Sequence, residues 1–136
     1  IGTDVGLRFK STRGRGGLVK DIWCERIYMK DIVSYGVIFN LYYAGVAASD
    51  MSTGRLPDIL PVDETTPEMR DIHFSEIVCA GAKQAIYING LPELPVSNIS
   101  FANSTFTAAA GEEIHFAEDI TFDNVYVNGR NISTYN

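Results

Sequence analysis

The chain has 136 residues, of which 46% are apolar, enough to form the core of a single domain. Its net charge of −6 disfavours nucleic-acid binding, and no run of eighteen apolar residues predicts a membrane span. The charge is uneven. Residues 1–20 carry five basic side chains and one acidic one, whereas the other 116 residues carry six basic and sixteen acidic ones. A local cationic strand of this kind suits one small anionic group, such as a carboxylate or a phosphate.

The first predicted strand is GLRFK, residues 6–10, and it carries two of these cations. Side chains alternate along a strand, so Arg8 and Lys10 share one face. Leu7 and Phe9 then point to the other face, toward a core. Like charges side by side are costly unless an anion or an acid neutralises them. The pair is therefore either an anion site or a solvated pair balanced by surface acids.

The turn that follows, STRGRGG at residues 11–17, is rich in glycine and arginine. It lacks the GxxxxGKS or GxxxxGKT pattern of a phosphate-binding loop, and no helical periodicity follows it. Its glycines favour a tight corner between two strands. The sequence does not decide whether Arg13 and Arg15 have a role beyond this corner.

The strand VIFNLYY, residues 37–43, follows the first strand after thirty residues. Alternation divides it into a more apolar set and a more polar set, and the apolar set should face the core. Asn40 and Tyr42 should then face outward, beside the two cations. Polar and aromatic groups together are typical of a sugar-binding surface, whereas Tyr43 is equally compatible with aromatic packing.

Residues 44–68 interrupt the pattern of strands. They contain three prolines and five acidic residues, a composition that excludes them from a packed coil. They also lengthen one turn of the chain to 49 or 50 residues, whereas the neighbouring turns take 27 to 30. We expect a surface insertion, which either walls a binding face or is a loop without function.

An internal repeat organises the rest of the chain. A polar pair followed by isoleucine recurs four times, and in three copies a second apolar strand follows after 14 or 15 residues. No segment shows a sustained helical period, and a repeat of roughly 20 to 50 residues indicates a solenoid. The sequence therefore predicts an all-β parallel β-helix of about four to five coils. The repeated isoleucines are Ile22, Ile72, Ile99 and Ile120.

Four other polar residues are interpreted as structural. His73 and His115 occur in IHF contexts of different repeats, where a histidine is more often packed than catalytic. Glu112 and Glu113 are neighbours, so they point to opposite faces of a strand. They therefore do not form a facing carboxylate pair.

The two cysteines, Cys24 and Cys79, lie 55 positions apart and form no CxxC pair. Their simplest role is that of small core side chains, and a disulfide between them stays open. No metal site and no cofactor are predicted.

The segments GLRFKSTRGRGG, LVKDIWCERIYMKDI and AIYINGLPELPVSNISFAN resemble the C-terminal part of polygalacturonase-like enzymes, glycoside hydrolase family 28. The resemblance covers about residues 3–128 and implies a right-handed, single-stranded parallel β-helix acting on pectin. In that family an Arg-x-Lys motif binds the uronate carboxylate next to the cleaved bond, which implies this role for Arg8 and Lys10. A tyrosine about thirty residues later lines the family's cleft, and Tyr42 is the better match, before Tyr43.

The family's inverting mechanism uses aspartates in Asn-x-Asp and Asp-Asp motifs, with a Gly-His-Gly motif after them, all upstream of Arg-x-Lys. This sequence contains no Asp-Asp pair and no Gly-His-Gly. It also begins abruptly at Ile1, without a polar cap. We therefore expect residues 1–136 to be the C-terminal part of one longer β-helix domain, with no catalytic residue in this chain and the catalytic residues upstream.

The expected function is that of a C-terminal fragment of a pectin hydrolase, inactive as isolated residues 1–136. Two other functions stay open: a non-catalytic β-solenoid that binds an acidic glycan, and then a pectate-lyase-like enzyme, which would need a calcium site of clustered acids. The expected partners are an acidic polysaccharide or oligogalacturonide and the missing N-terminal coils, with no nucleic acid and no membrane. The family implies a secreted or periplasmic location, although no signal is visible in the sequence.

Overall fold

The computed structural model describes residues 2–41 and 59–133 of the chain. Tyr42, Tyr43 and residues 44–58 of the expected insertion lie outside the described residues. Every regular element in the described part is a strand, so no helix there is able to cross a bilayer. The strands are β1 Val5–Lys10, β2 Leu18–Val19, β3 Ile22–Lys30, β4 Tyr35–Asn40, β5 Glu68–Ala80, β6 Gln84–Asn89, β7 Val96–Thr107, β8 Ala110–His115, β9 Ala117–Val127 and β10 Arg130–Asn131.

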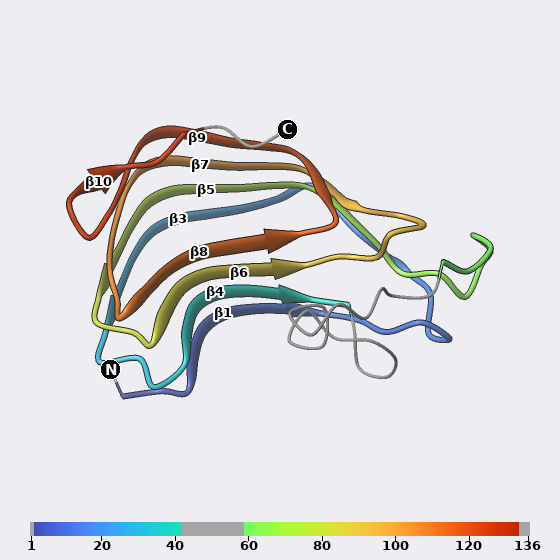
Figure 1. Cartoon of the computed structure of the whole chain (residues 1–136), viewed down its shortest axis with the longest axis horizontal. Helices are drawn as coiled ribbons and strands as arrows, with labels where there is room; N and C mark the ends of the chain where they lie inside the picture. The colour runs from blue at the N-terminus through green and yellow to red at the C-terminus, as the bar shows by residue number, and fades with distance from the viewer. Residues whose placement is uncertain (1, 42–58, 134–136) are drawn as a thin grey trace.

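The strands form a coil that climbs through two sheets (Figure 1). One sheet, which we call the front sheet, has the order β1-β4-β6-β8. The other has the order β10-β9-β7-β5-β2, and β3 also pairs with β5. All of these pairs are parallel except that of β10 with β9. The described residues therefore form a parallel β-helix, as the repeat predicted.

The long strands bend at corners where one residue adopts a positive φ between 50 and 57°. Asn and Asp tolerate this left-handed conformation better than most other residues, which explains why a polar residue directly precedes each repeated isoleucine. One corner, which we call the first corner, consists of Asp21, Asp71, Asn98 and Asp119. Neighbouring coils are joined along the corner, since Asn98 Nδ2 donates a hydrogen bond of 2.8 Å to Asp71 Oδ1. The second corner consists of Arg26, Glu76, Asn103 and Asn124.

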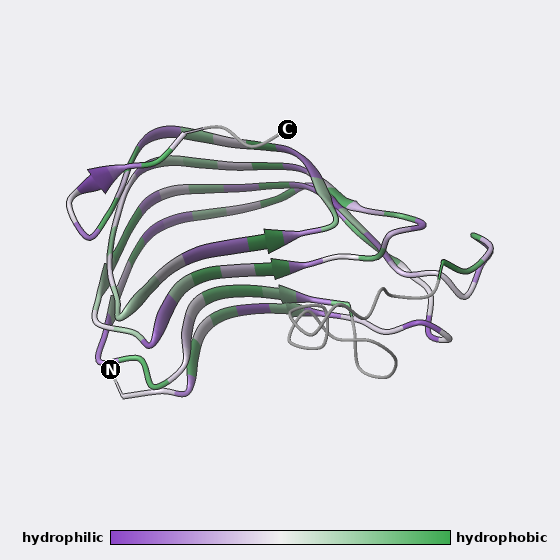
Figure 2. Ribbon diagram, in the orientation of Figure 1, coloured by the Kyte–Doolittle hydropathy of each residue, from purple (hydrophilic) through white to green (hydrophobic). Residues whose placement is uncertain are grey.

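The core runs through the middle of the coil as stacked columns of like side chains. The isoleucine column is fully buried from Ile72 to Ile120. Beside it, the ring of Phe101 stacks on the rings of Phe74 and Phe122, with centroid distances of 4.6 and 5.3 Å. Figure 2 shows the resulting alternation of apolar and polar residues along the strands. Each unit thus buries its apolar face against the next coil, as in other solenoids.

The two ends of the described coil differ. At the C-terminal end, β10 turns back on β9, and Arg130 Nη2 lies 3.0 Å from Glu112 Oε2. At the other end, no strand within the described residues pairs with the outer edges of β1 and β3. The described part of the expected insertion is residues 59–68, of which 59–67 lie outside any strand and Glu68 is the first residue of β5. The domain bounds and the role of the insertion stay predictions.

Candidate carbohydrate-binding groove

The cationic strand β1 lies beside β4 in the register that the thirty-residue spacing predicted. Arg8 is opposite Ile38, and Lys10 is opposite Asn40. The apolar set of β4 faces the core and is at most 1% exposed, namely Val37, Phe39 and Leu41. The alternation therefore places both cations and Asn40 on the outer face of the front sheet.

The outer face is hollowed beside the two cations. This hollow, the β1–β4 hollow, has a volume of about 270 Å³. A volume just below the roughly 300–1,000 Å³ of pockets for drug-sized ligands suits a single sugar unit. Two cations, an amide and an aromatic ring together suit a sugar that carries a carboxylate. Its lining among the described residues is Arg8, Lys10, Tyr35, Ile38 and Asn40.

Tyr35 is a site residue that simple alternation does not find. Counting back from Val37 places Tyr35 on the core face. Tyr35 nevertheless lines the hollow on the outer face, and its ring centroid lies 5.5 Å from that of Tyr87. The next residue, Gly36, packs closely against the neighbouring coil, since a Cβ atom there would lie 2.7 Å from the carbonyl oxygen of Ala85. The glycine before VIF was the available signal, because glycine in a strand often marks a close approach of two backbones or a departure from regular alternation.

Asp4 is the acidic residue that pairs with Arg8. Its Oδ2 lies 3.5 Å from Arg8 Nη2, and its Oδ1 accepts a hydrogen bond of 2.5 Å from Ser34 Oγ. Both side chains of the ion pair are about half exposed or more, so the pair contributes only about 0–1 kcal/mol. A ligand carboxylate of better geometry is therefore able to displace it.

The chain and its fold were compared with known proteins. No known protein-family profile matches the chain. A probable polygalacturonase from Vitis vinifera is 27% identical over 110 residues, which are 81% of this chain and 20% of that protein. The crystal structure of a hyperthermoactive exopolygalacturonase from Thermotoga maritima matches with a TM-score of 0.75 and 20% identity, over 97% of this chain and 26% of the other. The chain is thus similar to two polygalacturonases.

The chain spans about a fifth of the length of the Vitis vinifera protein and about a quarter of that of the solved structure. The structural match confirms the predicted right-handed parallel β-helix. Arg8 and Lys10 lie together on the groove, whereas Tyr42 and Tyr43 fall outside the described residues, so their place in the site stays a prediction.

The outer face of the front sheet continues from the hollow toward the C-terminal coils. Tyr87 lies between Tyr35 and His115, whose ring centroid is 6.5 Å from that of Tyr87. Burial, reinforced by the charge of Glu113 and by Tyr35, raises the pKa of Tyr87 to about 12. His115 Nε2 lies 2.9 Å from Glu113 Oε2. The groove is therefore cationic at β1 and carries an acid at β8.

The other polar residues singled out in the sequence lie away from the hollow. His73 Nδ1 is 2.7 Å from Ser100 Oγ in the second sheet, and its ring lies 5.4 Å from that of Trp23. Glu112 pairs with Arg130, and Glu113 pairs with His115. The two glutamates therefore do not face each other.

Both cysteines are free thiols, Cys79 buried and Cys24 half-buried. Burial raises the pKa of both. Within the described residues no group of three or more His, Cys, Asp or Glu side chains is arranged to hold a metal ion.

Proposed function

We propose that this chain is the C-terminal part of a glycoside hydrolase that cleaves galacturonate-containing polysaccharide with inversion. The observation that carries the proposal is the β1–β4 hollow, where Arg8 and Lys10 line one sugar-sized space together with Tyr35. Both cations project from the same face of one strand, so they are able to hold a uronate carboxylate by charge-assisted hydrogen bonds. Tyr42, and after it Tyr43, is proposed to complete the sugar-binding surface.

The proposed division of labour separates binding from bond cleavage. Arg8 and Lys10 fix the sugar ring, and this holds the scissile bond against a general acid and a general base supplied by upstream coils. The chain alone is proposed to bind acidic sugar without hydrolysing it, and the parent protein to act outside the cell or in the periplasm. The similarity to two polygalacturonases supports this role for the parent protein.

The first test is the binding of galacturonate and of neutral galactose to the 136-residue chain, followed by NMR titration. We expect galacturonate to bind more tightly, because only it carries a carboxylate. Arg8→Gln and Lys10→Gln should each weaken galacturonate binding about tenfold, the effect of losing one charge-assisted hydrogen bond. Lys83→Gln, which removes an exposed cation directly before β6, is the matched control. Equal binding of the two sugars would disprove the carboxylate role.

A second candidate function is that of a non-catalytic solenoid that binds an acidic glycan. It is favoured by one observation: Asp4, the acid beside Arg8, is already held by Ser34 and Arg8 itself. Hydrolysis assays on the protein with its upstream sequence separate the two functions. Release of reducing ends from polygalacturonate supports the hydrolase, and tight binding without release supports the binder. Calcium-dependent cleavage instead would indicate a lyase.

A further inference from the structure

A tryptophan is exposed on the outer face of the second sheet. Trp23, in β3, is 62% exposed, and it is the single tryptophan of the chain. Its neighbours Ile22 and Cys24 are partly buried and pack against the core, so alternation directs the indole outward. A ring of this size is highly buried in most folded proteins, because its exposure to water is unfavourable. Its position on the surface therefore suggests a ligand.

Trp23 begins a row of four outward side chains that crosses the coils. The parallel register places Trp23 opposite His73 in β5. The row continues to Ser100 in β7 and to Thr121 in β9, and these strands lie one above another in Figure 1. Neighbouring strands are about 4.8 Å apart, so this row, which we call the Trp23 row, is roughly 14 Å long.

The aromatic end of the row is held in place by its neighbours. The ring centroids of Trp23 and His73 are 5.4 Å apart, with 35° between the ring planes. His73 Nδ1 lies 2.7 Å from Ser100 Oγ, and this hydrogen bond orients the imidazole. The other ring nitrogen, Nε2, then donates to a ligand or accepts from it, according to the tautomer. The row thus combines an aromatic face with an imidazole nitrogen and two hydroxyls.

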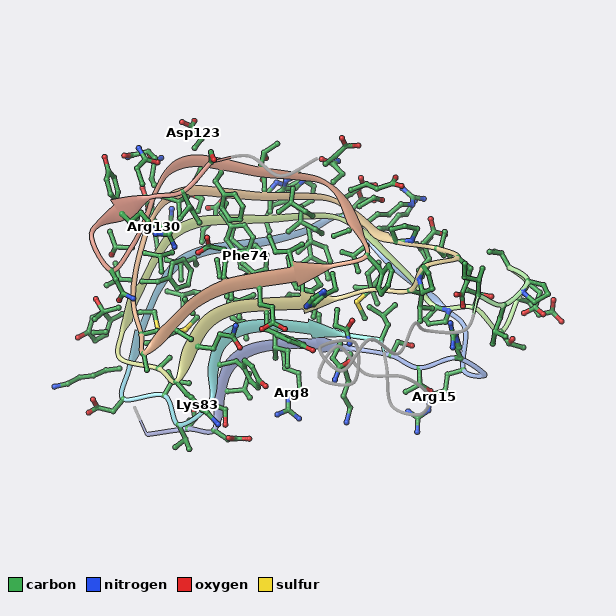
Figure 3. The ribbon with its side chains drawn as sticks, viewed as in Figure 1. Arg8, Arg15, Phe74, Lys83, Asp123 and Arg130 are labelled. Carbon is green, nitrogen blue, oxygen red and sulfur yellow. The ribbon has the colours of Figure 1, made fainter. Side chains whose placement is uncertain are left out.

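The charges around the row disfavour an acidic ligand. The next outward column begins with Glu25 in β3 and ends with Asp123 in β9, and Asp123 points away from the ribbon in Figure 3. The nearby cations are already paired, Arg26 with Glu25 and Arg70 with Asp71. A uronate, which the cationic β1–β4 hollow suits, meets the opposite charge pattern here. We therefore expect an uncharged ligand at the row.

A sugar matches this surface better than a protein partner does. A stable protein–protein interface buries about 800 Å² on each side around an apolar centre. In the Trp23 row the indole is the one large apolar group. The other exposed apolar side chains of these strands lie past the second corner, where the sheet has turned, namely Tyr28, Val78 and Tyr126. A sugar stacks its C–H groups on such a ring, while its hydroxyls bond to polar side chains.

We propose that the Trp23 row binds a neutral β-1,4-linked glycan. One sugar stacks on the indole of Trp23, and the next sugars follow the row, where His73, Ser100 and Thr121 bond to their hydroxyls. An extended β-1,4-linked chain presents flat faces of C–H groups, which match a strip of roughly 14 Å, the length of about three sugar units. The site attaches the protein to a polymer other than the acidic one. It is separate from the β1–β4 hollow and does not depend on the proposed function.

The test is a titration of the 136-residue chain with cellotriose, a neutral β-1,4-linked trisaccharide. Because Trp23 is the single tryptophan, its fluorescence reports on this site directly. Cellotriose should shift the emission to shorter wavelength, whereas trigalacturonate should leave it unchanged. In NMR titrations, Trp23→Ala should weaken cellotriose binding about tenfold, and Trp23→Phe, which keeps a smaller ring, should be intermediate. Ser100→Ala should weaken it about two- to fivefold.

Tyr28→Ala is the matched control, because it removes an equally exposed ring from the same strand past the corner. It should leave the affinity for cellotriose unchanged, and thermal melts should show that the variants remain folded. Emission that does not respond to cellotriose would overturn the inference. So would an equal loss of affinity in the Trp23 and Tyr28 variants, or an equal response to trigalacturonate. Self-association in sedimentation that Trp23→Ala abolishes would assign the ring to a contact between copies instead.

This proposal and the proposed function fail on different results. Arg8→Gln and Lys10→Gln should leave cellotriose binding unchanged, since both cations lie on the front sheet. If they fail to weaken galacturonate binding, the proposed function is disproved and the Trp23 site is not. If cellotriose does not bind while galacturonate binding depends on both cations, only the Trp23 site is disproved.

Discussion

At the scale of single residues, Arg8 has one observed partner and one proposed partner. In the structure it pairs with Asp4, and Asp4 is oriented by Ser34. The proposed substrate carboxylate needs the same guanidinium. We therefore propose that Asp4 competes with the substrate carboxylate for Arg8.

Replacing Asp4 by asparagine tests this competition. Asp4→Asn removes the competing charge and keeps a side chain of similar size, so galacturonate affinity should rise about two- to fivefold. The gain should shrink in high salt, because exposed charges are screened. Isothermal titration at two salt concentrations measures both effects. A loss of affinity would show instead that Asp4 positions Arg8 for binding.

A second residue-scale interaction is the ion pair of Arg13 with Glu93. Burial raises the pKa of Glu93, but the hydrogen bonds and charge of Arg13, with backbone hydrogen bonds, hold the pKa below its ordinary value. Because the pKa of Glu93 is lowered in the folded state, its ionised carboxylate stabilises the fold at pH values above the ordinary glutamate pKa of about 4.3. This contribution is lost as pH falls through the pKa of the folded state.

Removing one partner of this pair should be costly. Arg13→Gln leaves Glu93 buried without its cation, so the free energy of unfolding at pH 7 should fall by about 2–3 kcal/mol. The double variant Arg13→Gln, Glu93→Gln should lose less, because no buried charge remains. Urea unfolding at pH 7 and at pH 3.5 measures the free energy of unfolding of both variants. The difference in this free energy between the native chain and Arg13→Gln should shrink at the lower pH. An unchanged difference would contradict the proposed dependence of stability on the ionisation of Glu93.

At the scale of elements, neighbouring strands are held in register by columns of like residues. Phe74 in β5 stacks on Phe101 in β7 and meets Phe9 and Phe39 edge-on, at 5.8 and 6.0 Å. It is 1% exposed and lies inside the coil (Figure 3). One side chain therefore joins the second sheet to β1 and β4, the strands that carry the groove.

Truncating this side chain should weaken both the fold and the groove. Phe74→Ala should lower the free energy of unfolding by about 3–5 kcal/mol, because it removes buried ring surface and leaves a cavity. Tyr28→Ala is the matched control, since Tyr28 is 63% exposed on the second sheet, and it should cost far less. Chemical denaturation followed by circular dichroism gives both values. Similar losses of unfolding free energy in the two variants would argue against the phenylalanine column as the main contact between the two sheets.

At the scale of the whole molecule, each coil contacts only the coils next to it. The strands β5 and β7 have a parallel neighbour on both sides, whereas β1, β3 and β9 have one each among the described residues. Stability in such an arrangement is approximately a sum over coils and their interfaces, so it should vary along the axis.

Hydrogen exchange should report this gradient. Backbone amides of β5 and β7 are expected to exchange most slowly, and those of β1 and β10 most rapidly, because end coils open without disturbing the centre. Mass-spectrometric exchange on the 136-residue chain measures it, with β6 as an internal reference that is also paired on both sides. Uniform protection along the chain would instead indicate a single cooperative unit.

Much of this molecule was predictable from sequence because a solenoid repeats local rules. The repeated isoleucine fixed which residues face the core, and the polar residue before it fixed the corner, since left-handed φ favours Asn and Asp. The spacing of thirty residues gave the pairing of β1 with β4, and alternation put Arg8 and Lys10 on one face. All of these follow from the periodicity of a strand.

Only the tertiary structure decided the features that depend on non-local contacts. Tyr35 lines the hollow beside Gly36, which packs closely against the next coil, and Arg13 is partly buried because Glu93, eighty residues later, reaches its guanidinium. The same ion pair separates the two loop arginines into one that holds the fold and one, Arg15, that is presented beside Lys10. Sequence spacing carries no record of such contacts, because they join residues whose separation no repeat fixes.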